Sequence, residues 1–171
     1  MKRILLIVFL AACAPTGTVH LKAAAGITPE LLGDRPARFN AIMGCEVVSI
    51  EHTQEDYELK QDGINSLSVM PKDWDALEVG YYQRYRLSDE ADVVLRVTDG
   101  KIPTWAIYHE LAHLVGADHT ADPCSLMWSP HHPLWMWHAF QCQVTDPDER
   151  LRILRRQLGD DVLNYCPLEH P

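Results

Sequence analysis

One stretch constrains the fold of this chain more than any other: HELAHLVGADH, residues 109–119. The apolar spacing over residues 105–115 predicts a helix, with Thr104 as its N-cap and Gly116 placed to end it. His109 and His113 are four residues apart, so their rings project from adjacent turns of one face. The apolar side chains lie nearly opposite: Ile107, Leu111, Leu114 and Val115. The predicted helix therefore has one face for packing and one face for chemistry.

The same stretch carries the donors of a metal site that is open on one side. Two histidines one turn apart can reach a single ion, and a third donor from another direction is needed for a tetrahedron. Gly116 can adopt the positive φ that turns the chain sharply, and His119 follows three residues later. Glu110 lies one step round the helix, beside the ion. The spacing predicts a zinc site formed by His109, His113, His119 and a water.

A lone histidine is usually a surface or satisfied core residue, and HExxH by itself occurs by chance in unrelated chains. In a chain with 9 His and 9 Gly among 171 residues, chance produces the longer HExxHxxGxxH pattern on the order of once in ten thousand. Residues 109–119 match this longer pattern at every specified position. They resemble the signature of the metzincin zinc proteases.

Met127 adds to the resemblance. It follows His119 by eight residues, the spacing of matrixin-like members, and the resemblance implies a methionine turn beneath the zinc. Plain core packing of Met127 is compatible with this role. Ser129 occupies the position where astacins and serralysins have an additional tyrosine ligand, so a matrixin-like or separate bacterial branch matches better. The loops are too short for the structural metal sites of vertebrate-type matrixins, and we expect one catalytic zinc and no calcium.

The resemblance covers about residues 28–160 and implies an α+β fold of the zincin type. In this fold a small twisted sheet, mostly antiparallel-edged, precedes the zinc-binding helix, the methionine turn and a C-terminal helix. Residues 91–97, ADVVLRV, would be the antiparallel edge strand that pairs with an extended substrate. The implied function is a zinc-dependent endopeptidase with a zinc-bound water as nucleophile and Glu110 as general base. The alternative is a noncatalytic zinc-containing module that binds peptides.

Local patterns predict the remaining elements. Asp34 and Gly44 mark the start and the end of a predicted short helix. Apolar runs predict strands, with a further one at Val19 to Leu21 in an otherwise small and polar segment. The C-terminal helix starts at Pro147 and ends at Gly159, with charges ordered to match its dipole. The predicted strands lie at residues 45–52, 65–70, 81–85 and 91–97.

The N-terminus has the pattern of an export signal. MKRILLIVFLAAC begins with two cations and continues with an apolar run too short to span a membrane. Its end resembles a bacterial lipobox, which implies signal-peptide removal before Cys13 and lipidation of that residue. Ordinary cleavage after Ala14 is the alternative, although Pro15 would hinder it. We expect a signal peptide at 1–12, a lipidated tether at 13–27 and a catalytic domain at 28–171, anchored in a bacterial cell envelope, with the outer membrane favoured.

Four further cysteines are expected to form two disulfides in this oxidising location. Four cysteines allow three pairings. We favour Cys124 with Cys142 and Cys45 with Cys166, because this nests a short loop inside a link across the whole domain.

Composition limits the kinds of partner that this chain can bind. The formal net charge of −9 makes nucleic acid an improbable partner, and we expect a monomer that binds a protein or peptide substrate.

The aromatic side chains that follow Met127 form either a substrate pocket wall or a small lower core. They are Trp128, Trp135, Trp137 and Phe140, with Met136 among them, and nearby His131, His132 and His138 are expected to be surface or structural residues.

Overall fold

The computed structural model describes residues 17–54, 65–70, 80–84, 90–120, 122–128 and 142–166, with the backbone alone for 81–84. The predicted signal peptide at 1–12 and the lipidation site Cys13 lie outside the described residues, and both stay predictions. Ser129 and the aromatic and histidine residues between 131 and 140 also lie outside them.

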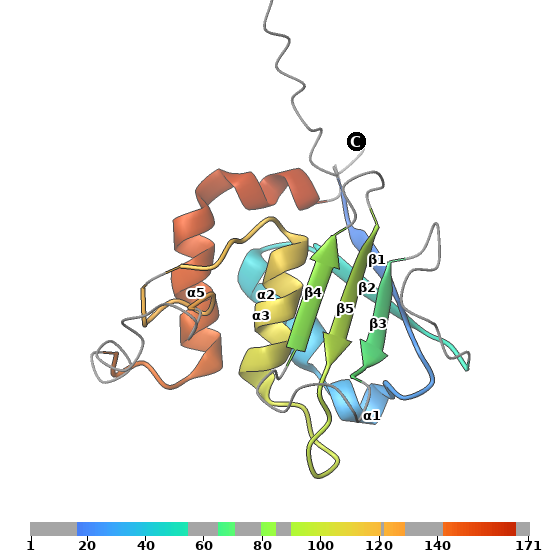
Figure 1. The fold of residues 1–171 in the computed structure, drawn as a ribbon. Helices are drawn as coiled ribbons and strands as arrows, with labels where there is room; N and C mark the ends of the chain where they lie inside the picture. Colours follow the sequence, from blue (N-terminus) through green and yellow to red (C-terminus); the bar gives the residue numbers. More distant parts are fainter. Residues whose placement is uncertain are drawn as a thin grey trace, which may run out of the picture.

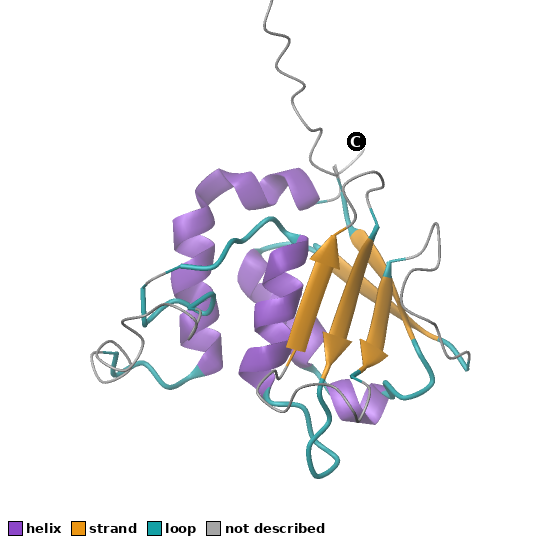
Figure 2. Cartoon of the chain, viewed as in Figure 1, coloured by secondary structure: helices purple, strands orange, loops and turns teal. Residues whose placement is uncertain are grey.

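Five strands form one sheet in the order β2-β1-β3-β5-β4 (Figure 2). Neighbouring strands are parallel from β2 to β5, and β4 alone runs antiparallel, against β5. The register places Val19 opposite Val48 and Gly80 opposite Leu95. Among the described strands, β4 therefore forms one edge of the sheet. The strands are β1 (Val19–Ala23), β2 (Val48–His52), β3 (Ser66–Val69), β4 (Gly80–Arg84) and β5 (Ala91–Leu95).

The prediction that residues 91–97 form the edge strand is wrong. β5 lies between β3 and β4, and all of its residues are buried, as expected for an interior strand covered on both faces. Its one charged residue, Asp92, accepts a hydrogen bond of 2.5 Å from the hydroxyl of Ser66 in β3. The sheet is therefore mostly parallel, and the predicted antiparallel edge is limited to β4.

The predicted tether at 13–27 is also corrected. β1 is a strand inside the sheet, paired on both sides, and Gly17 donates from its backbone N–H to Asn164 at 2.9 Å. Leu21 and Ala23 of β1 are buried while the alternate residues are exposed, because one face of this strand packs on the core and the other meets solvent. The folded domain therefore begins no later than Gly17, before the predicted boundary at residue 28.

Helices cover one face of the sheet. α3 (Thr104–Leu114) lies beside β4 and β5, α2 (Arg35–Met43) contacts α3, and α5 (Pro147–Leu158) packs on α2 and α3 away from the sheet (Figure 1). Two short elements were not predicted, α1 (Pro29–Leu32) and the 3-10 helix η1 (Gly159–Tyr165). The main core is apolar and lies between the sheet and these helices, where Phe39 and Tyr108 are fully buried.

The predicted helix boundaries are confirmed to within a residue or two. α2 follows Asp34 and ends at Gly44 in the left-handed conformation, at φ 96°. Asp146 caps α5 by accepting from the backbone N–H of Asp148. Thr104 is the exception, because it lies inside α3 and Pro103 occupies the N-cap position.

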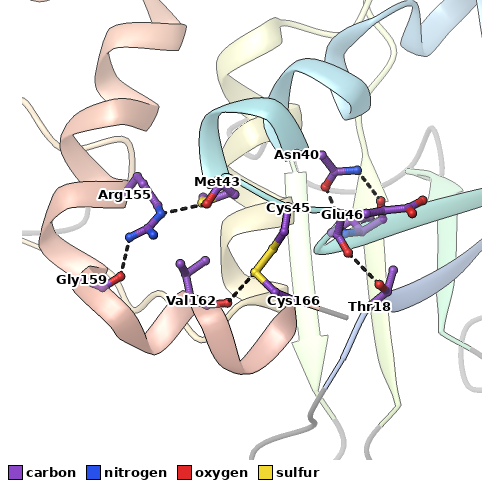
Figure 3. The surroundings of a disulfide bond; sticks show 10 residues. Thr18, Asn40, Met43, Cys45, Glu46, Arg155, Gly159, Val162 and Cys166 are labelled. Carbon is purple, nitrogen blue, oxygen red and sulfur yellow. Dashed lines mark hydrogen bonds between the residues drawn. A yellow bond between two sulfur atoms is a disulfide. The ribbon is translucent and has the colours of Figure 1, made fainter. Parts of the chain in front are cut away.

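Both favoured disulfides are present. Cys124 bonds to Cys142, and Cys45 bonds to Cys166 across a sequence separation of 121 residues. Figure 3 shows that the second bond ties the end of η1 to the chain that leaves α2. Arg155 of α5 donates to the carbonyl of Met43, the last residue of α2, at 2.9 Å, so a hydrogen bond also joins α5 to the end of α2.

In the part of the chain that the structure describes, no helix has the length and apolar character needed to cross a membrane.

Candidate metal centre

The end of α3 positions the first two histidines relative to the third. Ala117 donates to the carbonyl of Ala112 at 3.1 Å and Gly116 donates to that of His113 at 3.0 Å, which is the Schellman pattern of a helix end. Gly116 has φ 81°, as this motif requires. The chain reverses there and brings His119 back over the histidine face of the helix. The positive φ predicted at Gly116 is present.

The same reversal orients the ring of His113. The carbonyl of Ala117, just after the turn, lies 2.8 Å from Nδ1 of His113. A carbonyl only accepts hydrogen bonds, so Nδ1 carries the proton and donates it. The lone pair of this imidazole is therefore on Nε2, the ring nitrogen left for a metal.

A second carbonyl orients His109 in the same way. Nδ1 of His109 donates to the carbonyl of Leu126 at 3.0 Å. Leu126 belongs to a tight turn in which Trp128 donates to the carbonyl of Ser125. The backbone N–H of Thr120, next to His119, donates to Met127 at 2.9 Å, and Met127 is fully buried. The turn around Met127 thus holds the segments of two histidines in place.

The three imidazoles converge. Their ring centroids are 5.0, 5.2 and 4.8 Å apart, and each contributes a ring nitrogen to a set whose members lie within 4.8 Å of one another. Nε2 of His109 lies 3.1 Å from Nε2 of His119. Tetrahedral zinc with bonds of about 2.0–2.1 Å places ligand nitrogens roughly 3.3 Å apart. The donor set therefore fits one zinc ion held by His109, His113 and His119.

Burial keeps two of these imidazoles neutral. It lowers the pKa of His113 to about 4, and the neighbouring His109 acts in the same direction. Burial also lowers the pKa of His109, against a smaller opposing effect of its hydrogen bond to Leu126. Neutral imidazole is the form that binds a metal, so these two ligands need no deprotonation at neutral pH.

Glu110 lies against the edge strand β4. Its side chain is buried, with 5% exposed. A Cβ built on Gly80, the first residue of β4, would lie 2.4 Å from Oε1 of Glu110 and 2.9 Å from its Cδ. The carboxyl group thus contacts the β4 backbone at a position that only glycine leaves open. This contact of Gly80 had no signal in the sequence, because it depends on which strand lies beside α3.

A polar network behind the site, in which Tyr108 and Asp148 are buried, was also missed. Tyr108, next to His109 in α3, donates its hydroxyl hydrogen to Oδ1 of Asp148 at 3.0 Å, and Arg38 of α2 forms an ion pair with the other carboxylate oxygen. Burial and the bond to Asp148 raise the pKa of Tyr108. The network joins α2, α3 and α5 behind the histidine face. In the sequence, Asp148 indicated only a favourable charge at a helix start.

Comparisons with known proteins add little to this geometry. No family model matches the chain, and no curated protein matches it. A solved structure of a zinc-dependent peptidase from Methanocorpusculum labreanum (strain Z) is similar over 77% of this chain and 98% of that one, at 13% identity and a TM-score of 0.40. This likeness is too weak to establish a shared fold, and any assignment of function rests on the residues of the site.

Proposed function

We propose that this protein is a zinc-dependent endopeptidase of metzincin type. The observation that carries the proposal is the convergence of three histidine nitrogens, 3.1 Å apart for His109 and His119, beside a helix that also carries a buried glutamate. Three protein ligands leave one position of a tetrahedral zinc open, which is the mark of a catalytic rather than a structural site. A zinc ion held here would polarise a water molecule and lower its pKa toward neutrality.

The residues of the chain then have distinct roles. His109, His113 and His119 would hold the ion, and the carbonyls of Leu126 and Ala117 fix two of the rings. Glu110 accepts a proton from the attacking water and delivers it to the leaving amine. Its placement against β4 suits this role, because a general base has to lie between the water and the bound peptide.

The edge of the sheet is where we place the peptide. Among the described residues, β4 pairs with β5 on one side only, so an extended chain could pair with the backbone groups of its outer side. A peptide added along β4 would pass Gly80, where the carboxylate of Glu110 reaches the strand. The substrate strand that we predicted beside residues 91–97 is therefore reassigned to β4.

Cleavage of a diverse peptide library by the zinc-loaded protein tests the proposal. We expect cleavage that is lost on chelation, restored by zinc, and lost in Glu110→Gln, which keeps its zinc. The conservative control is Glu149→Gln, which changes an exposed glutamate of α5 and is expected to leave cleavage intact. Equal cleavage by Glu110→Gln would refute the role of Glu110. Zinc binding without cleavage of any peptide would favour a noncatalytic peptide-binding module.

We also propose that lipid on Cys13 anchors the domain in the cell envelope. Two acyl chains or more give stable anchoring, because each buried CH₂ contributes about 0.8 kcal/mol. Radiolabelled palmitate should label the wild-type protein in bacterial cells and not Cys13→Ala. Equal labelling of the two would refute the anchor and leave the zinc site unaffected.

A further inference from the structure

A pocket lies beside the histidine cluster, with a volume of about 340 Å³. Two tryptophans and a leucine supply apolar lining, and Thr145 and Arg150 supply polar groups. Among the described residues, the lining consists of Trp105, Leu126, Trp128, Thr145 and Arg150. Trp105 is 44% exposed, which is unusual for so large an apolar side chain. A concave site with apolar walls and a few placed polar groups is the usual form of a side-chain binding pocket.

The pocket and the metal centre share structural elements. Trp105 precedes His109 by one helical turn and lies on the same side of α3. Leu126 lines the pocket, and its carbonyl accepts the hydrogen bond that orients His109. Trp128 follows directly after the buried Met127. A side chain in this pocket would therefore belong to a peptide whose backbone passes the histidine cluster.

Arg150 gives the pocket its charge. Nε of Arg150 donates to the carbonyl of Val144 at 2.8 Å, which holds the guanidinium in place. A guanidinium has five N–H donors, and this bond uses one of them. Among the described residues, no carboxylate lies within ion-pair distance of Arg150, although Glu149 pairs with both Arg152 and Arg156 on the same helix. The pocket thus combines an apolar lining with a cation that has no anionic partner in the described chain.

From this combination we infer that the pocket selects a substrate group with an apolar stem and a terminal carboxylate, and that Arg150 is the residue that determines this specificity. A glutamate side chain has this chemistry, and the C-terminal carboxylate of a peptide presents the same groups when the side chain of the last residue is apolar. Trp105 and Trp128 cover the stem, and the Nη groups of Arg150 donate to the carboxylate. The inference rests on the proposed function, since it places the pocket along a peptide substrate.

Binding, measured without turnover, tests this specificity. The zinc-loaded full chain carrying Glu110→Gln is titrated by calorimetry with a neutral peptide in which a single Glu is moved through every position. A matched set has Gln in its place, and each peptide is made with a free and with an amidated C-terminus. Hydrogen bonds to a charged group contribute about 1.5–3 kcal/mol, so we expect binding at least about tenfold tighter for Glu than for Gln at one position. If the tenfold preference follows the free C-terminus instead, the carboxylate is that of the chain end.

Arg150→Gln decides whether this residue is responsible. We expect Arg150→Gln to bind the peptide with the carboxylate and its uncharged counterpart about equally. The preference should persist in Arg152→Gln, which removes the same charge from an exposed position of the same helix. A preference unchanged in Arg150→Gln, or no carboxylate preference in the parent protein, overturns the inference. The proposed peptidase activity is tested separately by cleavage, so a protein that binds with this preference without cleaving refutes the activity alone.

Discussion

The link between Cys45 and Cys166 is expected to be the largest single contribution to stability outside the core. Joining residues separated by 121 positions removes entropy from the unfolded chain, worth roughly 5 kcal/mol at 25 °C by loop-closure arithmetic. The bond between Cys124 and Cys142 closes a separation of only 18 residues, for which the same relation gives roughly 3 kcal/mol. We therefore expect Cys45→Ser with Cys166→Ser to destabilise the domain more than Cys124→Ser with Cys142→Ser.

The assay is urea unfolding of both double variants and the wild type, followed by far-ultraviolet circular dichroism. Metal-free protein is used, because zinc binding to the folded state would add its own stabilisation. The two double variants serve as controls for each other, since each loses one bridge and keeps the other. A loss below about 1 kcal/mol for the long link, or a larger loss for the short one, would refute the loop-entropy reasoning.

Three further predictions concern the site. Gly80→Ala should lower the rate of peptide cleavage by about 100-fold with zinc content unchanged. The Cβ of the introduced alanine would lie 2.4 Å from Oε1 of Glu110 and displace the carboxylate. An unaltered rate would show that this contact does not position the base. Tyr108→Phe should cost about 1–2 kcal/mol in urea unfolding, because it removes the hydroxyl that donates to Asp148 in a buried site; no loss would show that Arg38 alone satisfies that carboxylate. The metal-free protein should lose on the order of 2 kcal/mol of stability through His113 as the pH falls from 7 to 5. The pKa of His113 is about 4 in the folded protein and 6.5 ordinarily, so the unfolded state binds the proton first. Comparison with His113→Gln isolates that contribution, and parallel pH profiles of the two proteins would contradict it.

Local features of the site could be predicted from the sequence because they depend on near neighbours. The spacing of His109 and His113 and the glycine after the helix specify one helical face and one reversal, and both form without reference to the rest of the chain. Gly116 adopts the expected positive φ, and His119 returns to the cluster. Both disulfides also match their predictions, and Met127 is buried, which agrees with a turn beneath the site and with plain core packing.

The features that were missed depend on pairing between distant segments. The run ADVVL fits an edge strand or an interior strand, and only its pairing with β3 and β4 makes it interior. The small and polar residues around β1 predicted mainly a tether, yet its polar residues His20 and Lys22 alternate onto a solvent-facing side of a strand. The contact of Glu110 with Gly80 and that of Tyr108 with Asp148 likewise join segments that no local pattern relates.

The most direct test of the central claim is the metal content of the purified chain, together with the ligand set of the bound metal from X-ray absorption. An open site formed by His109, His113 and His119 predicts one zinc per chain with three imidazole nitrogens and an oxygen from water. His119→Ala serves as the matched variant and should lose most of the metal while remaining folded. Absence of zinc, or a fourth ligand from the protein, would contradict the account of a catalytic centre.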